Sequence, residues 1–200
     1  MVLEVLVVCG TVAVVAAAKG ADVHRRHLAD RTLERYARVR GCAFAPASAA
    51  SGRASPRVEG KLRDVPFTLD LCRIGSRLTT RMSAPIARPP APRLALVQRA
   101  RLARALQLID HAAVAGWDDP RLDHAYRVCG LSPDEARVLF EPHHAVLRLL
   151  DDRSDVWFAC DGGAASLTWS GVETDPAILD AARDLVVAAA GWHRAMAPYR

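Results

Sequence analysis

The sequence lacks the short motifs by which several common enzyme classes are recognised. It contains no Gly-x-Ser-x-Gly elbow, no phosphate-binding P-loop and no dinucleotide-binding fingerprint. Lysine is also scarce, because only Lys19 and Lys61 occur among the 27 basic residues. Alanine is abundant, so this skew indicates a GC-rich coding bias and not a function that requires guanidinium groups. These absences favour a non-enzymatic protein, and no cofactor is predicted.

Paired cysteines are missing as well. The five cysteines are widely scattered and form no Cys-x-x-Cys pair. An odd number at such spacing argues against a disulfide framework and is typical of a reducing compartment.

One long apolar run is present, and it occupies residues 5–18. Together with residues 1–4 it gives a segment roughly 27 Å long as a helix, just enough to cross a bilayer. A signal peptide cleaved after Ala16–Ala18 is the first alternative, but such a peptide should open with Lys or Arg and this chain has Glu4. A buried core helix is the second. We therefore expect residues 1–18 to be a transmembrane anchor, with secretion after signal cleavage as the alternative.

Basic residues follow the apolar run at once. Residues 19–40 hold seven basic residues against three acidic ones, whereas 41–200 carry a net charge of only +2. Positive charge beside a span stays in the cytoplasm, so the pattern predicts a single-pass inner-membrane protein with its N-terminus outside and its domain cytoplasmic. Membrane lipid is the expected partner of residues 1–40, and the low charge of the remainder argues against nucleic acid. The residues expected at the membrane surface are Lys19, Arg25, Arg26, Arg31 and Arg35.

Hydrophobic periodicity predicts helices at both ends of the chain. Ala29, Leu33, Tyr36 and Ala37 share one face of a helix that Gly41 ends, so residues 19–41 are expected to be a basic juxtamembrane helix. A capping box at 132–135 begins another helix, redirected near residue 142, and a long apolar stripe predicts a final helix from residue 176. The spacing in 99–115 is ambiguous and favours a helix.

Alternating side chains predict strands between these helices. They are expected at 42–45, 58–62, 65–72, 78–84, 94–98, 126–129, 155–161 and 164–170. Strand runs followed by helices, without strict β-α-β alternation, indicate an α+β fold with a mainly antiparallel sheet. We expect residues 42–200 to form one domain, in which two or three helices pack on the sheet, including the long C-terminal one.

One acidic stretch is a candidate metal site. Asp118, Asp119, Asp123 and His124 place three carboxylates and an imidazole within seven residues, and hard cations bind several such oxygens. The stretch lacks the spacing and glycine of an EF-hand, and a turn around Pro120 explains the same residues.

The order of these motifs resembles an uncharacterised bacterial family of membrane-anchored α+β domains of unknown function. The resemblance covers roughly residues 33–197 and lies in the order of the segments 33–41, 56–67, 116–123 and 128–130, followed by the hairpin and the last helix. It implies the architecture above and no activity.

The sequence thus leaves two hypotheses for function. The first is a non-enzymatic, membrane-tethered interaction domain that presents its sheet or the 155–170 hairpin to an unknown protein partner. Within that hairpin, Trp157 is a candidate for an exposed patch, while Phe158 and Trp169 are expected to pack beneath the last helix. The alternative is a ligand-sensing or weak metal-dependent enzyme domain that uses the acidic stretch 118–124.

Overall fold

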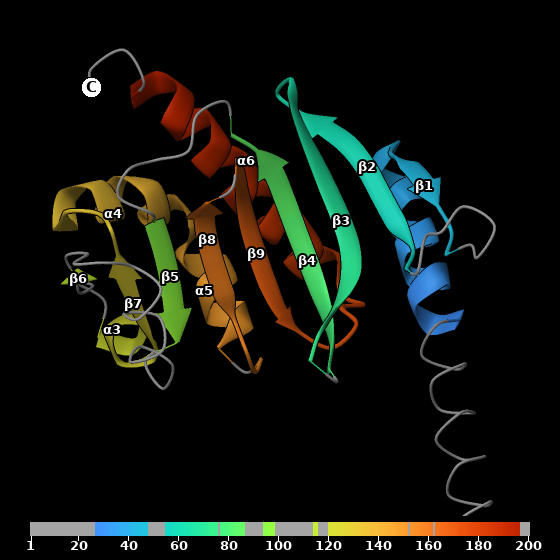
Figure 1. The fold of residues 1–200 in the computed structure, drawn as a ribbon, viewed down its shortest axis with the longest axis horizontal. Coiled ribbons are helices and arrows are strands. Elements are labelled where there is room, and N and C mark those ends of the chain that lie inside the picture. The colour runs from blue at the N-terminus through green and yellow to red at the C-terminus, as the bar shows by residue number, and fades with distance from the viewer. Residues whose placement is uncertain are drawn as a thin grey trace, which may run out of the picture.

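The protein folds as one curved sheet with helices on one side (Figure 1). The structure is a computed structural model and describes residues 27–47, 55–75, 77–86, 94–98, 114–115, 120–151, 153–161 and 163–196. The strands are β1 (Ala43–Ala45), β2 (Arg57–Leu62), β3 (Val65–Ile74), β4 (Arg77–Pro85), β5 (Leu94–Gln98), β6 (Val114–Ala115), β7 (Tyr126–Cys129), β8 (Trp157–Asp161) and β9 (Ala164–Ser170). The helices are an unlabelled one at 27–40, α3 (Pro120–Ala125), α4 (Pro133–Phe140), the 3-10 turn η2 (Glu141–His143), α5 (His144–Leu150) and α6 (Pro176–Met196).

Among the described residues, nine strands form the sheet, in the order β1-β2-β3-β4-β9-β8-β5-β7-β6. Every pair of neighbouring strands is antiparallel. The β8–β9 hairpin, late in the chain, is inserted between β4 and β5 and so joins the two halves of the sheet. The predicted α+β class, the antiparallel sheet and the long C-terminal helix are confirmed.

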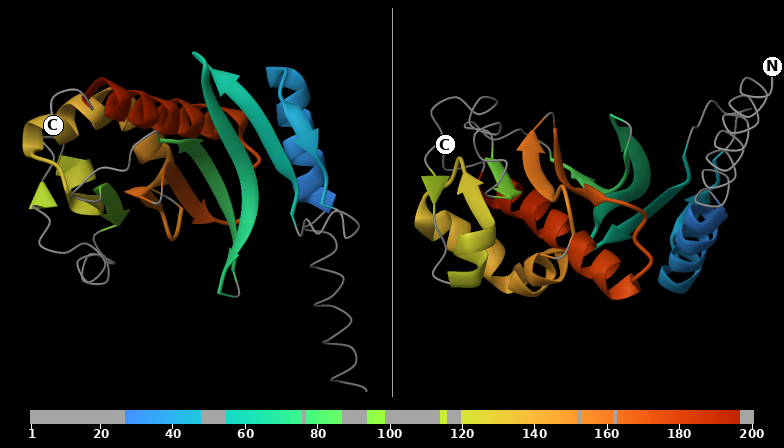
Figure 2. Two further views of the ribbon diagram at one scale, coloured as in Figure 1. Left: turned by 45° about the horizontal axis from the view of Figure 1, so that its top comes forward. Right: turned by 90° about the horizontal axis from the view of Figure 1, so that it is seen from below.

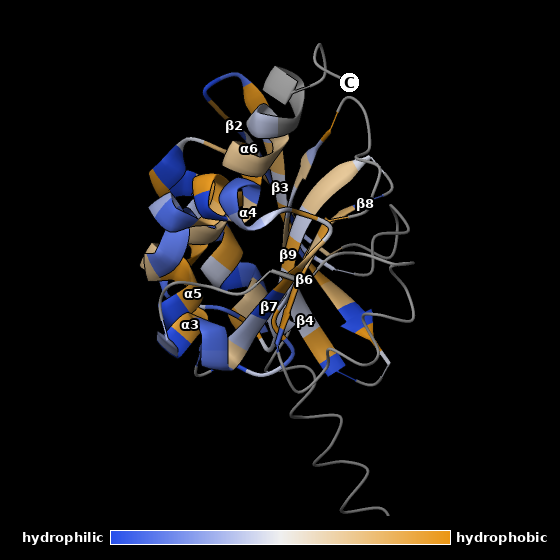
Figure 3. Cartoon of the chain, turned by 90° about the vertical axis from the view of Figure 1, so that its left-hand side faces the viewer, coloured by the Kyte–Doolittle hydropathy of each residue, from blue (hydrophilic) through white to orange (hydrophobic). Residues whose placement is uncertain are grey.

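The described helices all cover the same face of the sheet, as the views from below and from the side show (Figures 2 and 3). Helix α6 lies across β3, β4 and β9 and also contacts α4 and α5. We call the opposite side of the sheet the open face, because none of the described helices packs on it.

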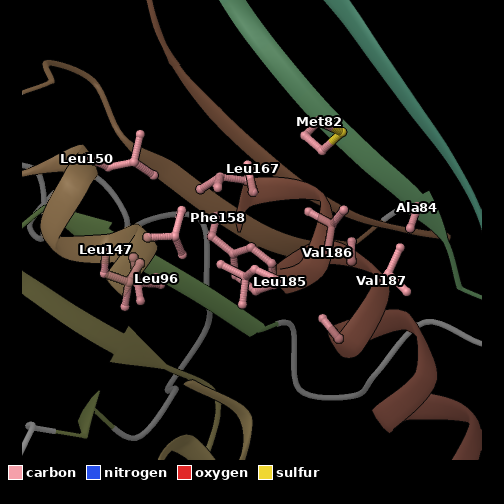
Figure 4. Packing of buried hydrophobic residues seen from close by; sticks show 14 of the residues in the cluster. Met82, Ala84, Leu96, Leu147, Leu150, Phe158, Leu167, Leu185, Val186 and Val187 are labelled. Carbon is pink, nitrogen blue, oxygen red and sulfur yellow. The ribbon is translucent and has the colours of Figure 1, made fainter. Parts of the chain in front are cut away.

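The hydrophobic core lies between the sheet and these helices (Figure 4). Phe158 and Leu167 point from the sheet toward Leu185 of α6, and all three are fully buried. Burying one such side chain stabilises the fold by roughly 1.5–3 kcal/mol. Phe158 and Trp169 are both 0% exposed, so the expectation that they pack inside the domain is confirmed.

The helix at 27–40 belongs to this core. Its predicted apolar face is confirmed, because Ala29, Leu33, Tyr36 and Ala37 are at most 4% exposed, and Gly41 ends it with a φ of +65°. Three of these four residues join the same core cluster as the sheet and α6. The apolar face therefore packs on the domain, whereas the sequence pattern suggested a juxtamembrane helix separate from residues 42–200.

Local sequence features position the remaining turns as expected. Arg63 and Asp64 join β2 to β3 with φ values of +51° and +64°, and Ser132 and Glu135 form the predicted capping box. Pro142 lies in η2, which redirects the chain between α4 and α5. Val114 and Ala115 form β6, although the spacing in 99–115 favoured a helix; residues 99–113 lie outside the described part.

Within the described residues, no helix combines the length and the apolar character that a membrane crossing requires. The predicted anchor at 1–18 lies outside that part of the chain.

Candidate functional site on the open face of the sheet

From β2 to β5, the side chains of the open face change from charged to apolar, and β7 adds the charged Arg127 beyond Val97. Because side chains alternate along a strand, residues directly opposite one another form rows across this face. One row is Arg57, Asp70, Arg81, Thr168, Trp157 and Val97; the next is Glu59, Thr68, Ser83, Ser166, Ala159 and Ala95. Charges thus lie over β2–β4, hydroxyls over β4 and β9, and an indole with aliphatic groups over β8 and β5.

Two hollows follow this gradient. A groove of about 740 Å³ runs over β3, β4, β8 and β9, where its lining includes Cys72, Arg81, Trp157 and Ser166. A second hollow of about 800 Å³ lies over β2–β4 beside Ser83. The open face is therefore hollowed over β2–β4, β8 and β9, and concave surfaces are typical of binding sites.

Arg81 is held rigidly in the middle of the groove. Its Nε and Nη2 donate to the two carboxylate oxygens of Asp70 at 2.8 and 2.6 Å. This bidentate pair fixes the plane of the guanidinium and, through those hydrogen bonds, raises the pKa of Arg81. Among the described residues, only Asp70 engages Arg81, through Nε and Nη2, so the donors on Nη1 are left for another group.

A second ion pair closes the groove at the start of β4. Arg77 Nη1 lies 2.6 Å from Asp155 Oδ2, which also accepts a hydrogen bond of 2.7 Å from the hydroxyl of Ser170. Asp155 has a φ of +63°, a left-handed conformation that costs a non-glycine residue roughly 1–2 kcal/mol. The two contacts hold that backbone in place.

The hydroxyl groups of the open face flank Arg81. Thr168 donates to the backbone carbonyl of Trp157 at 3.3 Å, whereas Ser83 and Ser166 face each other across β4 and β9. Trp157 is half-buried and packs against a small apolar cluster of Ala95, Val97 and Cys129. Trp157, the candidate for an exposed apolar patch, thus lies between the hydroxyl groups and the apolar side chains of the open face.

The four cysteines of the described residues are poor nucleophiles. Burial raises the pKa of Cys72 in the groove, and it also raises the pKa of Cys42, Cys129 and Cys160. A protonated thiol neither attacks nor binds metal well. Asp70, Asp155 and Glu59 on the open face each pair with an arginine, so the arrangement is suited to holding polar groups rather than to proton transfer.

The acidic stretch is only partly described. Asp118 and Asp119 lie outside the described residues; Asp123 and His124 lie on α3. Arg127 donates to the Asp123 carboxylate at 2.8 and 3.2 Å, and His124 is exposed. Within the described residues, no three His, Cys, Asp or Glu side chains are close enough to share a metal ion. The metal site stays a prediction, with the Asp123 carboxylate engaged by arginine.

Of the basic residues predicted at the membrane surface, only some belong to the described part of the chain. Lys19, Arg25 and Arg26 lie outside the described residues, whereas Arg31 and Arg35 lie on the exposed side of the helix at 27–40. On that side Glu34 is paired with Arg38 at 2.9 Å.

A polar cluster fixes this helix to α6. Tyr36 donates to Asp180 Oδ1 at 3.0 Å, Arg40 pairs with the other oxygen of Asp180, and Arg183 lies 3.0 Å from Oδ1. Burial and the charge of Asp180 raise the pKa of Tyr36, so its phenol stays protonated. The helix is therefore fastened by both apolar and charged contacts.

Sequence reasoning missed one buried carboxylate, Glu173, between β9 and α6. Its side chain is 3% exposed and accepts hydrogen bonds from Trp169 Nε1 (3.2 Å), Arg153 Nε (3.3 Å) and the backbone amides of Thr174 (2.9 Å) and Asp175 (3.0 Å). All four partners are donors, which identifies Glu173 as a structural anchor. Only Trp169 four residues earlier gave a local signal, since the indole of a buried Trp needs an acceptor.

The sequence matches no protein-family model and no curated protein. Among solved structures, the chain is similar to the mycobacterial trehalose monomycolate transport factor A, TtfA, at 11% sequence identity and a TM-score of 0.42. The match covers 81% of this chain and 92% of that chain. A likeness of this strength supports no conclusion about the activity of the present chain.

Proposed function

We propose that this chain is a non-enzymatic interaction domain, tethered to the cytoplasmic side of the membrane through residues 1–40, which binds a protein partner on its open face. The observation that supports the proposal is the hollowed open face, on which none of the described helices packs and where Asp70 orients Arg81. The groove of about 740 Å³ lies over the middle of the sheet, where a bound partner would contact β3, β4, β8 and β9 at once.

The chemistry of the face suits a partner that offers both polar and apolar groups. Arg81 is oriented by Asp70 before any partner arrives, which lowers the entropy lost on binding. Ser83 and Ser166 supply hydroxyls that both donate and accept, and Trp157 supplies an apolar ring of the kind enriched at interfaces. A polypeptide segment carrying a carboxylate and an aliphatic side chain would match this order.

The tether is supported by the exposed basic side of the helix at 27–40. Arg31 and Arg35 point away from the core while the apolar side is fastened to α6 through Asp180. Each basic residue near an anionic leaflet contributes about 1 kcal/mol of attraction. Because this helix is part of the globular unit, such attraction would orient the whole domain and not only a linker.

Site-specific photo-crosslinking in cells tests the partner surface. A photo-reactive residue at Ser166 is expected to give one discrete protein adduct, and one at Val138, which is 64% exposed on α4, should give none. Arg81→Ala should weaken the adduct at position 166 without changing the thermal midpoint by more than a few degrees, because Arg81 is about half exposed. Equal adducts at positions 166 and 138, or an adduct indifferent to Arg81→Ala, would refute the proposed surface.

Fractionation tests the tether separately. The full chain should sediment with membranes and stay bound to them at high salt. A reporter that is active only in the cytoplasm should be active when it is fused to the C-terminus. Recovery of the intact chain in the soluble fraction, or a mature chain that begins near Lys19 outside the cell, would refute this part of the proposal.

A further inference from the structure

The groove on the open face offers hydrogen-bond donors that the described residues leave unused. Asp70 engages Arg81 through Nε and Nη2, and Arg81 makes no other hydrogen bond within the described part of the chain. In the same part, the indole N–H of Trp157 and the hydroxyl of Ser166 have no hydrogen-bond partner. Arg81, Trp157 and Ser166 all line the groove. Because a guanidinium and an indole donate but do not accept, the groove is suited to a ligand rich in acceptor oxygens.

Arg81 and Trp157 lie in one row across the sheet. Arg81 on β4 is directly opposite Thr168 on β9, and Thr168 is directly opposite Trp157 on β8. Two strand spacings separate the backbones of Arg81 and Trp157, which is about 10 Å. The long side chain of Arg81 reaches into this interval. An acceptor group held by Arg81 would therefore leave its neighbouring atoms beside the indole ring.

The groove is closed on two sides. At the start of β4, Arg77 Nη1 lies 2.6 Å from Asp155 Oδ2, and both residues line the groove. On the β8 side, Trp157 packs on an apolar cluster whose members are at most 1% exposed: Ala95, Val97 and Cys129. The second hollow of the open face begins at Ser83, directly opposite Ser166. A segment that enters from this hollow meets both closed sides, which favours a chain end over a segment that passes through.

The C-terminus of a polypeptide has the matching chemistry. Its carboxylate brings two acceptor oxygens, and the last side chain leaves the backbone next to them. We propose that the groove binds the C-terminal end of a partner polypeptide, with the terminal carboxylate on Arg81 Nη1 and an apolar last side chain against Trp157. Ser166 donates to a backbone carbonyl of the entering segment. This inference rests on the proposed function and names the part of the protein partner that the open face binds.

The test measures the binding of synthetic peptides to the full chain in mild detergent. A peptide library is randomised at every position except a C-terminal leucine, and it is offered in two forms, with a free carboxylate and with a terminal amide. Mass spectrometry identifies the enriched peptides, and fluorescence polarisation measures their affinities. We expect enrichment from the free-acid library alone. The amide of an enriched peptide should bind about tenfold more weakly or worse, because it lacks the charged acceptor for Arg81.

Two variants assign the carboxylate to Arg81. In Arg81→Gln the guanidinium is gone, so the acid and amide forms of one peptide should bind nearly alike. Arg38→Gln is the matched control on the exposed side of the helix at 27–40, and it should keep the preference for the acid. The comparison of acid with amide on the unchanged chain does not require either variant to fold.

The outcomes separate this inference from the proposed function. Equal enrichment from the two libraries, or a preference for the acid that survives Arg81→Gln, overturns the contact of a terminal carboxylate with Arg81. Amide peptides that carry Asp or Glu and depend on Arg81 would show a side-chain carboxylate in its place, which also overturns the inference. If neither library binds, docking of a C-terminus is overturned. Photo-crosslinking at Ser166 then decides separately whether a protein partner covers the open face.

Discussion

Replacing Glu173 by glutamine should destabilise the domain strongly, although the two side chains have nearly the same shape. The four groups around this carboxylate are all hydrogen-bond donors, and they divide between its two oxygens: Trp169 and Arg153 on Oε2, and the amides of Thr174 and Asp175 on Oε1. A glutamine amide has one oxygen and one NH₂ group. Whichever way it is turned, its NH₂ faces two donors.

The less costly orientation keeps the oxygen on the two backbone amides. Arg153 is 41% exposed and can turn to water, but Trp169 is 0% exposed and loses its acceptor. Removing a charged acceptor and leaving one buried donor unsatisfied costs about 2–4 kcal/mol. Denaturant unfolding of the full chain in mild detergent, followed by tryptophan fluorescence, measures this loss.

Glu59→Gln is the matched control. Glu59 is 57% exposed and pairs with Arg57 at the surface, so its change should cost less than about 1 kcal/mol. If the two variants unfold within about 1 kcal/mol of each other, the argument that donors surround Glu173 on every side is refuted.

Three further changes test the packing, a turn and the docked helix. Gly60→Ala should destabilise the domain by about 1–3 kcal/mol in denaturant unfolding, because the new Cβ would lie 2.6 Å from Cys42 Sγ and 2.7 Å from the Phe67 ring. Asp64→Gly should raise the free energy of unfolding by up to about 1 kcal/mol, since Asp64 has a φ of +64°. Tyr36→Phe should reduce the loss of stability above about pH 10: the raised pKa of Tyr36 favours the protonated phenol, and the stability that this contributes is present below the unfolded pKa and lost as pH rises above it.

Two glycines provide controls for these variants. Gly191→Ala places a Cβ in open space within α6 and should be neutral or stabilising. Gly75→Ala also meets no neighbour but must adopt a φ of +62°, so it should lose about 1–2 kcal/mol. A Gly60→Ala variant as stable as Gly191→Ala would contradict the packing around Cys42, and a neutral Gly75→Ala would contradict the turn argument. If Tyr36→Phe loses as much stability above about pH 10 as the unchanged protein does, the argument about the Tyr36 phenol is contradicted.

Local patterns predicted the elements because their causes are local. Alternation gave β3 and β4, the capping box gave the start of α4, and helical spacing gave the buried side of the helix at 27–40. The partners of these elements could not be predicted from such patterns. The same spacing that buries Leu33 and Tyr36 against the domain would also suit a helix lying on lipid. Their packing in the core and the contact of Tyr36 with Asp180, far along the chain, decide between the two.

The candidate site illustrates the same limit. The open face depends on β9 pairing with β4, which brings Ser166 opposite Ser83 across 83 residues of sequence. The Arg81–Asp70 pair follows from the register of β3 and β4. It could therefore be predicted from the two strands and the position of their turn. The position of Trp157 at the edge of the groove needed the insertion of the β8–β9 hairpin into the middle of the sheet, for which no local pattern exists.

Alkylation of the native cysteines tests the central claim most directly, because two of them report on different surfaces. Cys72 lies in the groove of the open face, whereas Cys42 follows the helix at 27–40 and packs at the edge of the core; both are half-buried. If a partner covers the open face, Cys72 in native membranes should react with a maleimide about tenfold more slowly than in the purified chain, and Cys42 should react at the same rate in both. Equal rates for Cys72 in the two preparations would contradict the proposal that this face is a binding surface.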